Sequence, residues 1–437
     1  MALRRKSMYG LEMELITLDS EGKLVNGAPA ILKAVEGKNI SRYVRKEISQ
    51  SLVELGAKEK RTVKESAAAF LEVIQDTIEI AEQLGYHLLP LGTHPGRQLP
   101  KLHRTEWYDA KKAVLGENTY KEGRICGFHF HYTLPEGIVE KDTKTIKSVG
   151  RSKARDIFLQ QYNFLVAVDP AMLTFCQSTP FWMGVNWAKD CRVLVYRDFK
   201  VTKGGESFEG IHYYLPMFGA LPNYEFTLQD IRVMADTKKA EWLRMLEQKK
   251  FPTNEIACVP SLKFMWGPLR VNKIGTFEYR GPDMNHPEVV FSTSDLLVHL
   301  LSMIEKKQIH VEPSDIGVSE PFLYEDGTIY VPPHTTLKYL EQQSVVHGFD
   351  STDIHAYCSR LLSLVEKIPG KKPKYLDRIK KMVKEKKSVS DDILDMVKKN
   401  GYKTDEEVPE DMLDHIALYH AKKISSDITD LRKRFAL

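Results

Sequence analysis

The 437-residue sequence has few cysteines and almost no excess of charge of one sign. Its five cysteines are scattered and include no C-x-x-C pair, which argues against a disulfide framework and a cysteine-rich zinc site. The formal net charge is only +4, so charge gives no general argument for binding nucleic acid or an anionic membrane. At 42% apolar and 28% charged residues, the composition is that of a globular protein, not a disordered chain.

Long apolar runs are missing too. No stretch of about 18 apolar residues predicts a membrane-spanning helix. Glu12 and Glu14 interrupt the apolar residues near the start, so a signal peptide is not expected. Together with the unpaired cysteines, these features predict a protein of the reduced cytoplasm.

Several nucleotide and metal motifs are absent. The sequence contains no Walker A loop, no G-x-G-x-x-G and no H-E-x-x-H. If a nucleotide binds, a glycine-rich phosphate cradle is therefore not the means.

The periodicity of apolar residues predicts a mixed fold. Residues 62–85 give the clearest helix, with Thr62 and Glu65 in a capping-box pattern and Gly85 at the C-terminal end. Further helices are expected at 153–168, 228–249, 293–308 and 353–367, and strands at 9–18, 86–91, 125–134, 192–197, 257–266 and 274–281. Because these elements do not alternate as βαβ units, we predict an α+β fold with a mostly antiparallel sheet.

The C-terminal part has a different character. Residues 371–387 contain nine Lys or Arg against two Asp or Glu, a local charge of +7 that leaves −3 for the rest of the chain. From about residue 374 the pattern is helical. We predict a main domain over 1–310 and a mainly helical extension over 311–437. The basic run is interpreted as a solvated helical face, with contact to nucleic acid or a partner chain as the alternative.

Three predicted strands carry polar pairs opposite an apolar face. In 9–16, Glu12 and Glu14 share one face, about 7 Å apart. Two like charges beside apolar neighbours repel each other unless a cation compensates them, and Mg²⁺ prefers such carboxylate oxygens. The alternative to a cation site is that the two carboxylates lie on the solvent-exposed face of an edge strand.

The other two strands repeat this arrangement. His129 and His131 share the face opposite an all-apolar one in 125–134, and Glu278 shares a face with Arg280 in 275–283. Each pair alone has a structural explanation. If the three strands share a sheet, however, one surface carries acidic groups, imidazoles and a guanidinium, which suits phosphoryl transfer.

Glu47 and Glu54 form a further acidic pair. They are seven residues apart, so a regular strand places them on opposite faces. They can converge only across a bend or a bulge.

Five motifs occur in a characteristic order: G-L-E-M-E-L (10–15), G-T-H-P (92–95), C-G-F-H-F-H (126–131), S-T-P-F-W-M-G (178–184) and F-E-Y-R-G-P-D (277–283). In this respect the chain resembles the carboxylate–amine ligase family that includes the type 2 glutamate–cysteine ligases, a branch of the glutamine synthetase-like fold. The resemblance covers roughly residues 8–290.

The resemblance implies a curved, mostly antiparallel sheet with helices packed behind it, and Mg²⁺ or Mn²⁺ on the sheet. By motif position it implies that Arg280 lies near the γ-phosphate of ATP. The implied metal ligands are Glu12, Glu14, Glu47, Glu54, His129 and Glu278, and the implied substrate or nucleotide contacts are His131, His94, Arg192 and Arg197.

The implied reaction has two steps. A substrate carboxylate attacks ATP to give an acyl phosphate and ADP, and an amine then displaces phosphate to form an amide. The namesake pair is glutamate and cysteine, and a homo-oligomer is in keeping with the family. However, residues 185–190 read V-N-W-A-K-D where the family usually has an Asp-Thr-Gly-like turn, so the substrates stay open.

Two other functions remain as alternatives. One is a zinc-dependent hydrolase built on His129 and His131, although the nearby acidic groups favour harder cations. The other is a non-catalytic scaffold or binding protein that uses the 371–387 run.

Overall fold

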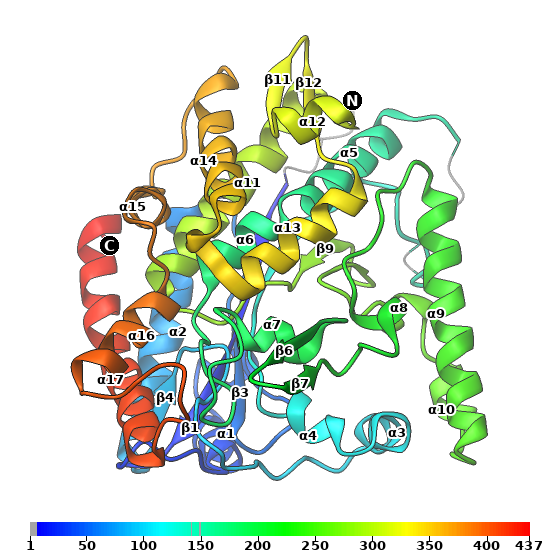
Figure 1. The fold of residues 1–437 in the computed structure, drawn as a ribbon. Helices are drawn as coiled ribbons and strands as arrows, with labels where there is room; N and C mark the ends of the chain where they lie inside the picture. The colour runs from blue at the N-terminus through cyan, green and yellow to red at the C-terminus, as the bar shows by residue number, and fades with distance from the viewer. Residues whose placement is uncertain (1–6, 141, 148–149) are drawn as a thin grey trace.

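The centre of the computed structural model is a seven-stranded sheet, and the described residues are 7–140, 142–147 and 150–437. Its order is β2-β3-β1-β5-β9-β8, with β4 also paired to β1, and all pairings are antiparallel (Figure 1). The strands are β1 (Tyr9–Leu18), β2 (Val44–Lys46), β3 (Leu52–Gly56), β4 (His87–Leu89), β5 (Phe128–Thr133), β8 (Leu269–Asn272) and β9 (Thr276–Tyr279). The predicted mixed fold with an antiparallel sheet is confirmed.

The register of this sheet places the three polar pairs side by side. Glu12 lies opposite His129 in the β1–β5 pairing, and His131 lies opposite Glu278 in the β5–β9 pairing. On the other side of β1, Glu14 lies opposite Glu54 of β3. The alternating residues of β1 and β5, among them Met13 and Phe130, are fully buried and anchor the strands on the apolar core.

Helices cover the apolar face. α2 (Val63–Gln83) contacts β1 and β3, while α11 (Pro287–Lys307) contacts β5 and α5 (Lys153–Ala167). The predicted cap of α2 is confirmed, because the hydroxyl of Thr62 accepts the backbone N–H of Glu65 and Gly85 has a φ of +81°. α11 starts earlier than predicted, with Pro287 in its first turn, where the missing N–H costs nothing.

α11 is long and apolar enough to span a membrane by length and composition alone. In the folded chain, 78% of its most apolar window is buried inside the protein. Its Leu296, Leu297, Leu300 and Leu301 belong to the central hydrophobic core. The apolarity of this helix is therefore accounted for by its place at the centre of the fold.

The C-terminal region packs on the same core. α17 (Glu410–Phe435) contacts α2 and β4, and Figure 1 shows this red helix beside the light-blue α2. The carboxylate of Glu410 accepts hydrogen bonds from both the backbone N–H and the guanidinium of Arg97. A single apolar cluster runs from Tyr9 to Phe435, so residues on both sides of the boundary predicted at 310 share it. That boundary stays a prediction.

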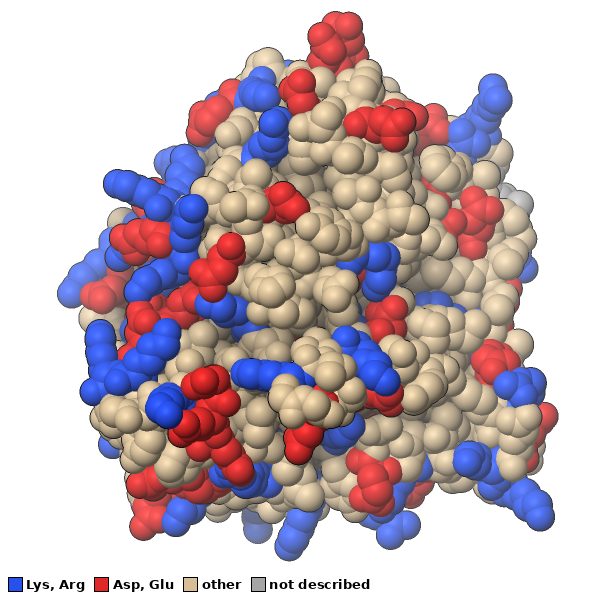
Figure 2. All heavy atoms as spheres, viewed as in Figure 1, with Lys and Arg blue, Asp and Glu red and all other residues tan. Residues whose placement is uncertain are grey.

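The basic run of 371–387 includes α15 (Asp377–Glu385), whose Ile379, Met382 and Val383 are buried. Its charged residues have acidic neighbours: Arg378 lies 3.8 Å from Asp392, and Lys387 lies 2.5 Å from Asp395. Figure 2 shows Lys and Arg interspersed with Asp and Glu on the left side, where Figure 1 places α15 to α17. The local excess of positive charge is thus spread among carboxylates brought from other helices.

Two predicted strands are wrong. Residues 192–197 lie mainly in the short helix α7 (Cys191–Tyr196), because Asp190 caps its first turn by accepting the N–H of Val193, and the whole segment is buried. Residues 257–266 contain the end of α10 (Asn254–Ala257) and a 3₁₀ turn over 261–264 that follows Pro260. At 192–197 capping and burial outweighed the β-propensity of the apolar residues.

The remaining elements complete the layers around the sheet. Two small sheets are formed by β6 (Lys200–Lys203) with β7 (Glu206–Glu209), and by β10 (His310–Pro313), β12 (Thr328–Val331) and β11 (Leu323–Glu325). The other helices are α1 (Ala28–Val35), α3 (Glu106–Leu115), α4 (Asn118–Glu122), α6 (Asp169–Cys176), α8 (Pro216–Gly219), α9 (Leu228–Gln248), α12 (Asp315–Ser319), α13 (His334–His347), α14 (Thr352–Lys367) and α16 (Val389–Lys399). The five cysteines are free, and Cys258 alone among them is exposed.

The end of α17 provides a test of how firmly the C-terminal region is attached. Phe435 is 2% exposed and packs on Phe291 and Tyr375, with ring centroids 5.6 Å and 4.1 Å away. We expect Phe435→Ala to lower the free energy of unfolding by about 3–5 kcal/mol, because it leaves a cavity in a shared core. Leu437→Ala, at a side chain 46% exposed, is the control and should change little in the same denaturant titration. Equal effects of the two would contradict this packing.

Candidate metal and nucleotide site

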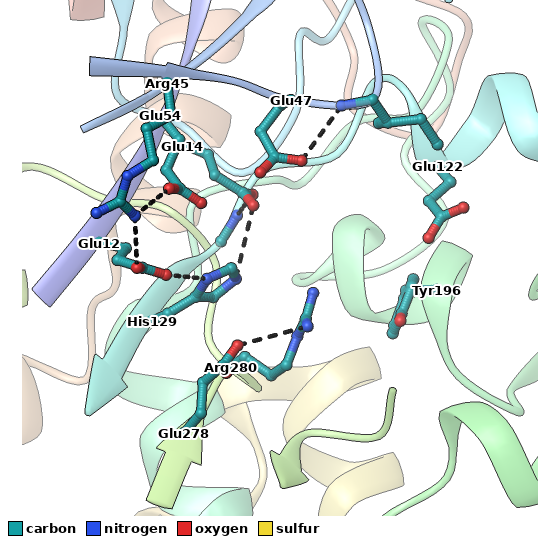
Figure 3. Close-up of polar contacts among 12 residues, drawn as sticks. Glu12, Glu14, Arg45, Glu47, Glu54, Glu122, His129, Tyr196, Glu278 and Arg280 are labelled. Atoms are coloured by element: carbon teal, nitrogen blue, oxygen red, sulfur yellow. Dashed lines mark hydrogen bonds and ion pairs between the residues drawn. The ribbon is translucent and has the colours of Figure 1, made fainter. Parts of the chain in front are cut away.

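The polar face of the central sheet gathers acidic side chains from four places in the sequence (Figure 3). β1 supplies Glu12 and Glu14, β3 supplies Glu54, the residue after β2 supplies Glu47, and β9 supplies Glu278. With the two histidines of β5 they form three sets whose ligand atoms lie within 4.8 Å of one another: Glu12, Glu54 and His129; Glu12, His131 and Glu278; and Glu14, Glu47 and Glu54. The six residues predicted as metal ligands therefore lie together.

Glu47 reaches this group by a route that the sequence did not reveal. The segment is not one regular strand, because β2 ends at Lys46 and a turn leads into β3. In the resulting hairpin Arg45 pairs with Glu54, so the chain reverses between the two acidic residues. The predicted convergence across an irregularity is confirmed, and the irregularity is a strand reversal.

The two histidines lie between the acidic residues. His129 places Nδ1 3.4 Å from Glu12 Oε2 and Nε2 3.6 Å from Glu14 Oε1. His131 places Nε2 3.3 Å from Glu12 Oε2, and its Nδ1 is 3.0 Å from the hydroxyl of Thr276. Among the described residues, the buried Nε2 atoms of both rings lack a hydrogen bond of good geometry. Each ring thus keeps a nitrogen directed at the carboxylates.

Arginines supply part of the counter-charge. Arg45 Nη1 lies 3.0 Å from Glu12 Oε1 and 2.8 Å from Glu54 Oε1. Arg270 Nε lies 2.6 Å from Glu278 Oε2, and Arg280 Nη1 lies 3.5 Å from Glu278 Oε1. The guanidinium of Arg280 projects into the open middle of the group in Figure 3, toward Tyr196 and Glu47.

The carboxylates of the acidic group have pKa values shifted in opposite directions. Burial, followed by the charges of Glu12 and Glu47, raises the pKa of Glu54 well above its usual range. Burial and the charge of Glu14 raise the pKa of Glu47 to about 7, and burial also raises the pKa of Glu14. The pKa of Glu12 is lowered despite its burial, because His129 Nδ1 donates to its carboxylate and the imidazole of His131 lies 3.3 Å away. The protein's own cations therefore do not neutralise the whole group.

Divalent cations of the Mg²⁺ type fit this donor set. The ligands are mostly hard carboxylate oxygens, converging in threes, and the inner carboxylates repel one another when charged. Two imidazoles with free nitrogens complete the donors. The opposite inference, a structural ion-pair network, accounts for Glu12, Glu54 and Glu278, which have arginine partners. It does not account for Glu14 and Glu47, which form no ion pair with an arginine among the described residues.

A cavity of about 740 Å³ opens beside this group. Glu12, Arg45 and His131 line its inner end. It is also lined by the basic side chains of Lys144, Lys153 and Lys273 and by the acidic side chains of Glu59, Glu136 and Glu305. This mixture of apolar walls with a few basic and acidic side chains is typical of a small-molecule site.

Three predicted contact residues are buried, and their hydrogen bonds go to protein groups outside the acidic group. Arg197 forms a salt bridge with Asp169, 2.5 Å from its Oδ2, and another with Glu341. His94 donates from Nε2 to the carbonyl of Gly22 and accepts the N–H of Gly96. Arg192 donates to the carbonyl of Gly281, 2.6 Å away, and its charge opposes the rise in the pKa of Glu14. Their bonds to neighbouring protein groups position the backbone around Gly281 and the 92–96 loop.

The sequence interpretation missed four residues that support the group. Arg45 pairs with Glu12 and Glu54, Thr276 fixes His131, and Arg270 and Asn272 both hold Glu278. Arg270 and Asn272 alternate with buried Leu269 and Val271, so the run L-R-V-N carried a signal of the same kind as the recognised strands. Arg45 had no comparable signal, because its strand has only three residues.

The comparisons with known proteins agree with the motifs in the first half of the chain. Residues 8–199 match the model of glutamate–cysteine ligase family 2. The predicted resemblance to the type 2 glutamate–cysteine ligases is confirmed. The matched segment contains Glu12, Glu14, Glu47, Glu54 and His129, whereas Glu278 and Arg280 lie beyond it.

Two curated relatives give the extent of the similarity. A protein of Roseiflexus castenholzii named "Putative glutamate--cysteine ligase 2" is 25% identical over 210 residues, 47% of this chain and 48% of that protein. A protein of the same name from Clavibacter sepedonicus is 28% identical over 182 residues, 41% of this chain and 43% of that protein. The chain thus spans about half the length of the curated relatives it matches.

Solved structures share the fold over nearly the whole chain. The crystal structure of glutamate–cysteine ligase from Francisella tularensis in complex with AMP matches with a TM-score of 0.58 and 10% identity, covering 99% of this chain and 92% of that one. A bifunctional glutathione synthetase from Pasteurella multocida matches with a TM-score of 0.56 and 13% identity, covering 97% and 52%. At these identities the likeness extends to the arrangement of elements only.

Metal binding can be tested by stability. We expect Mn²⁺ at about 100 times its Kd to raise the free energy of unfolding by roughly 2.7 kcal/mol. Glu54→Gln should remove most of this gain, since Glu54 belongs to two of the three ligand sets, yet should not weaken the metal-free protein, where it relieves repulsion. Thermal melts with Mn²⁺ and with EDTA measure both effects. Glu82→Gln, at an exposed position of α2, is the control, and a full Mn²⁺ gain in Glu54→Gln would refute the site.

Proposed function

We propose that the protein is an ATP- and Mg²⁺-dependent ligase that joins a carboxylate to an amine. The observation that carries the proposal is the convergence of acidic side chains, two imidazoles and Arg280 on one polar sheet face beside a cavity of about 740 Å³. Phosphoryl transfer needs little covalent chemistry from a protein. It needs positioning and neutralisation of charge, which this face can supply.

Glu12, Glu14, Glu47, Glu54, His129 and Glu278 are the residues that would hold Mg²⁺ or Mn²⁺. When bound, the ions neutralise the phosphate oxygens of the nucleotide. The nucleotide is assigned to the adjoining cavity, with its phosphates at the inner end where Arg45 and His131 lie.

Arg280 is the proposed catalytic residue. The pKa of its guanidinium is raised despite burial, by the Tyr196 hydroxyl and the Glu278 and Glu14 carboxylates, so it stays charged. It can stabilise the negative charge on the phosphoryl group as that group passes from ATP to the substrate carboxylate. Arg270 supports this by sharing Glu278, so the carboxylate is not engaged by Arg280 alone.

The proposed substrates are the γ-carboxyl group of glutamate and the amine of cysteine, as the names of the relatives suggest. Attack of the carboxylate oxygen on ATP gives an acyl phosphate and ADP. Attack of the amine nitrogen on the acyl carbon then forms the amide and expels phosphate. No enzyme nucleophile is required, and burial raises the pKa of the Cys126 thiol, the cysteine next to the site, well above its usual range.

Several coarser properties belong to the same proposal. The sheet with helices on one face is assigned to the glutamine synthetase-like class, with residues 1–310 as its catalytic domain and 311–437 as an extension that alters specificity or assembly. The protein is placed in the cytoplasm as a homo-oligomer acting on small molecules, with neither a membrane nor nucleic acid as partner.

The direct test is an acyl-phosphate trap. Pure protein with ATP, Mg²⁺ and hydroxylamine should form a hydroxamate with one acid of a panel that includes glutamate, because hydroxylamine intercepts the activated carboxyl group. Glu12→Gln should abolish the product while leaving the fold intact by circular dichroism. The zinc hydrolase is the outcome if zinc supports hydrolysis and no acid gives hydroxamate or extra phosphate. The scaffold reading is the outcome if neither reaction occurs.

Arg280 gives a second, quantitative test. We expect Arg280→Met to lower kcat for acid-dependent ADP formation by about 10³-fold, since a positioned arginine contributes on this scale in phosphoryl transfer. Arg232→Met, at an exposed position of α9, is the matched control and should leave kcat unchanged. A kcat in Arg280→Met within a few-fold of the wild-type value would remove Arg280 from the catalytic machinery.

A further inference from the structure

A second cluster of titratable side chains lies at the junction of α11, α15, α16 and α17. His286, which caps the N-terminal end of α11, and His420 of α17 are both 4% exposed. His286 Nε2 lies 2.8 Å from His420 Nδ1, and His286 Nδ1 lies 2.6 Å from Asp427 Oδ2. The three side chains thus form a chain from a carboxylate through two rings. None of them belongs to the acidic group on the sheet.

The end of this chain has a free nitrogen. The Nε2 atom of His420 is buried and has no hydrogen-bond partner among the described residues. Because a buried polar atom without a partner costs free energy, this nitrogen is the place where a ligand would be favoured. His420 lines a cavity of about 480 Å³ that is bounded by the four helices.

The charged residues of this cavity favour an anion. Its cationic lining residues are Arg378, Lys387, Lys399 and Lys423, and its acidic ones are Glu288, Asp392 and Asp395. Two of the acidic residues are engaged at close range, Asp395 by Lys387 at 2.5 Å and Glu288 by Arg434 at 2.6 Å, and the cation Lys423 is paired with Asp427. Arg378 is loosely paired with two carboxylates, 3.8 Å from Asp392 and 4.0 Å from Glu288, and Lys399 has no ion pair within the described parts of the chain.

A metal ion suits the cavity less well. In the described residues, no set of three close metal-ligating atoms includes His286, His420 or Asp427. The positive end of the 21-residue helix α11 also lies at His286, where it favours negative charge.

We propose that this cavity binds a small tetrahedral oxyanion of the phosphate class, held by Arg378, Lys399 and the Nε2 hydrogen of His420. Arginine and lysine are the side chains that bind such oxyanions most often, and Asp392 can accept the remaining hydrogen of HPO₄²⁻. The site is separate from the proposed ligase centre, and its existence does not depend on ligase activity.

Binding at this site is coupled to a proton. Burial lowers the pKa of His286 and of His420, so both rings are neutral when the cavity is free. With the hydrogen of His286 on Nδ1, facing Asp427 Oδ2 2.6 Å away, His286 Nε2 accepts the hydrogen of His420 Nδ1, and His420 Nε2 carries a lone pair. For His420 Nε2 to donate to an oxyanion, the two histidines must take up one proton from solvent. The resulting positive charge is stabilised on His286 by the neighbouring carboxylate of Asp427.

The charged and titratable groups that face the two rings include some that raise the pKa of the histidines and some that lower it. They are Lys423, Tyr419 and Asp427 from α17, Arg378 from α15, Asp392, Asp395 and Lys399 from α16, Glu288 from α11, and Lys387 from the turn after α15. Because the bound state carries the extra proton, the oxyanion should bind more tightly as pH falls.

Calorimetric titration of the full chain with inorganic phosphate, in EDTA and without nucleotide, tests the site. We expect one site in the wild type, and about tenfold or greater weakening in Lys399→Met. Lys398→Met, the exposed neighbour that does not line the cavity, should leave the affinity unchanged. Equal affinities of Lys399→Met and Lys398→Met would overturn the proposal, as would binding lost in Arg280→Met, which would place phosphate at the sheet.

Two further arms sharpen the result. Titration with ADP in the absence of Mg²⁺ shows whether the site binds the phosphate group of a nucleotide more tightly than free phosphate. Whichever of the two binds more tightly, its affinity should fall in Lys399→Met. Sulfate, which does not titrate near neutrality, should bind more tightly at about pH 6 than at about pH 8, and His420→Gln should flatten this dependence. A pH dependence unchanged in folded His420→Gln, or binding of Zn²⁺ in place of the oxyanions, would contradict the proposal.

Discussion

Repulsion among the buried carboxylates on the polar face of the central sheet is the constraint on which the surrounding structure depends. Glu14, Glu47 and Glu54 come within ligand distance of one another, and burial raises the pKa of each. Such a group is stable only if something holds its members together and something else neutralises them. The scaffold holds the carboxylates together, but it neutralises only part of their charge.

The scaffold holds the group through pairing and packing. Antiparallel register sets Glu14 against Glu54 and Glu12 against His129, so the acidic positions follow from strand alignment. The alternate residues of the same strands are fully buried beneath α2 and α11, which prevents a shift of register. The C-terminal helix α17 closes this core from the far end of the sequence, so distant parts of the chain stabilise the acidic face. Within the described residues, the counter-charge comes mainly from Arg45, Arg270 and Arg280.

Much of the site was predictable because a strand has a period of two. Glu12 and Glu14, His129 and His131, and Glu278 and Arg280 were each recognisable opposite an apolar face, and the fold brings all three strands into one sheet. Glu47 required the family resemblance, because a strand reversal separates it from Glu54. Residues 192–197 were misassigned as a strand, since their capping by Asp190 and complete burial are tertiary effects. The pairing of Arg197 with Glu341, 144 residues away, was invisible for the same reason.

The central claim is that the acidic face holds divalent cations under a nucleotide. It is tested most directly by a crystal structure of the protein soaked with Mn²⁺ and a non-hydrolysable ATP analogue, with anomalous diffraction to locate the metal. We predict anomalous peaks among Glu12, Glu14, Glu47, Glu54, His129 and Glu278, with the analogue's phosphates beside them and Arg280 within reach of the terminal one. Nucleotide bound elsewhere, or bound at this face with no metal among these residues, would contradict it.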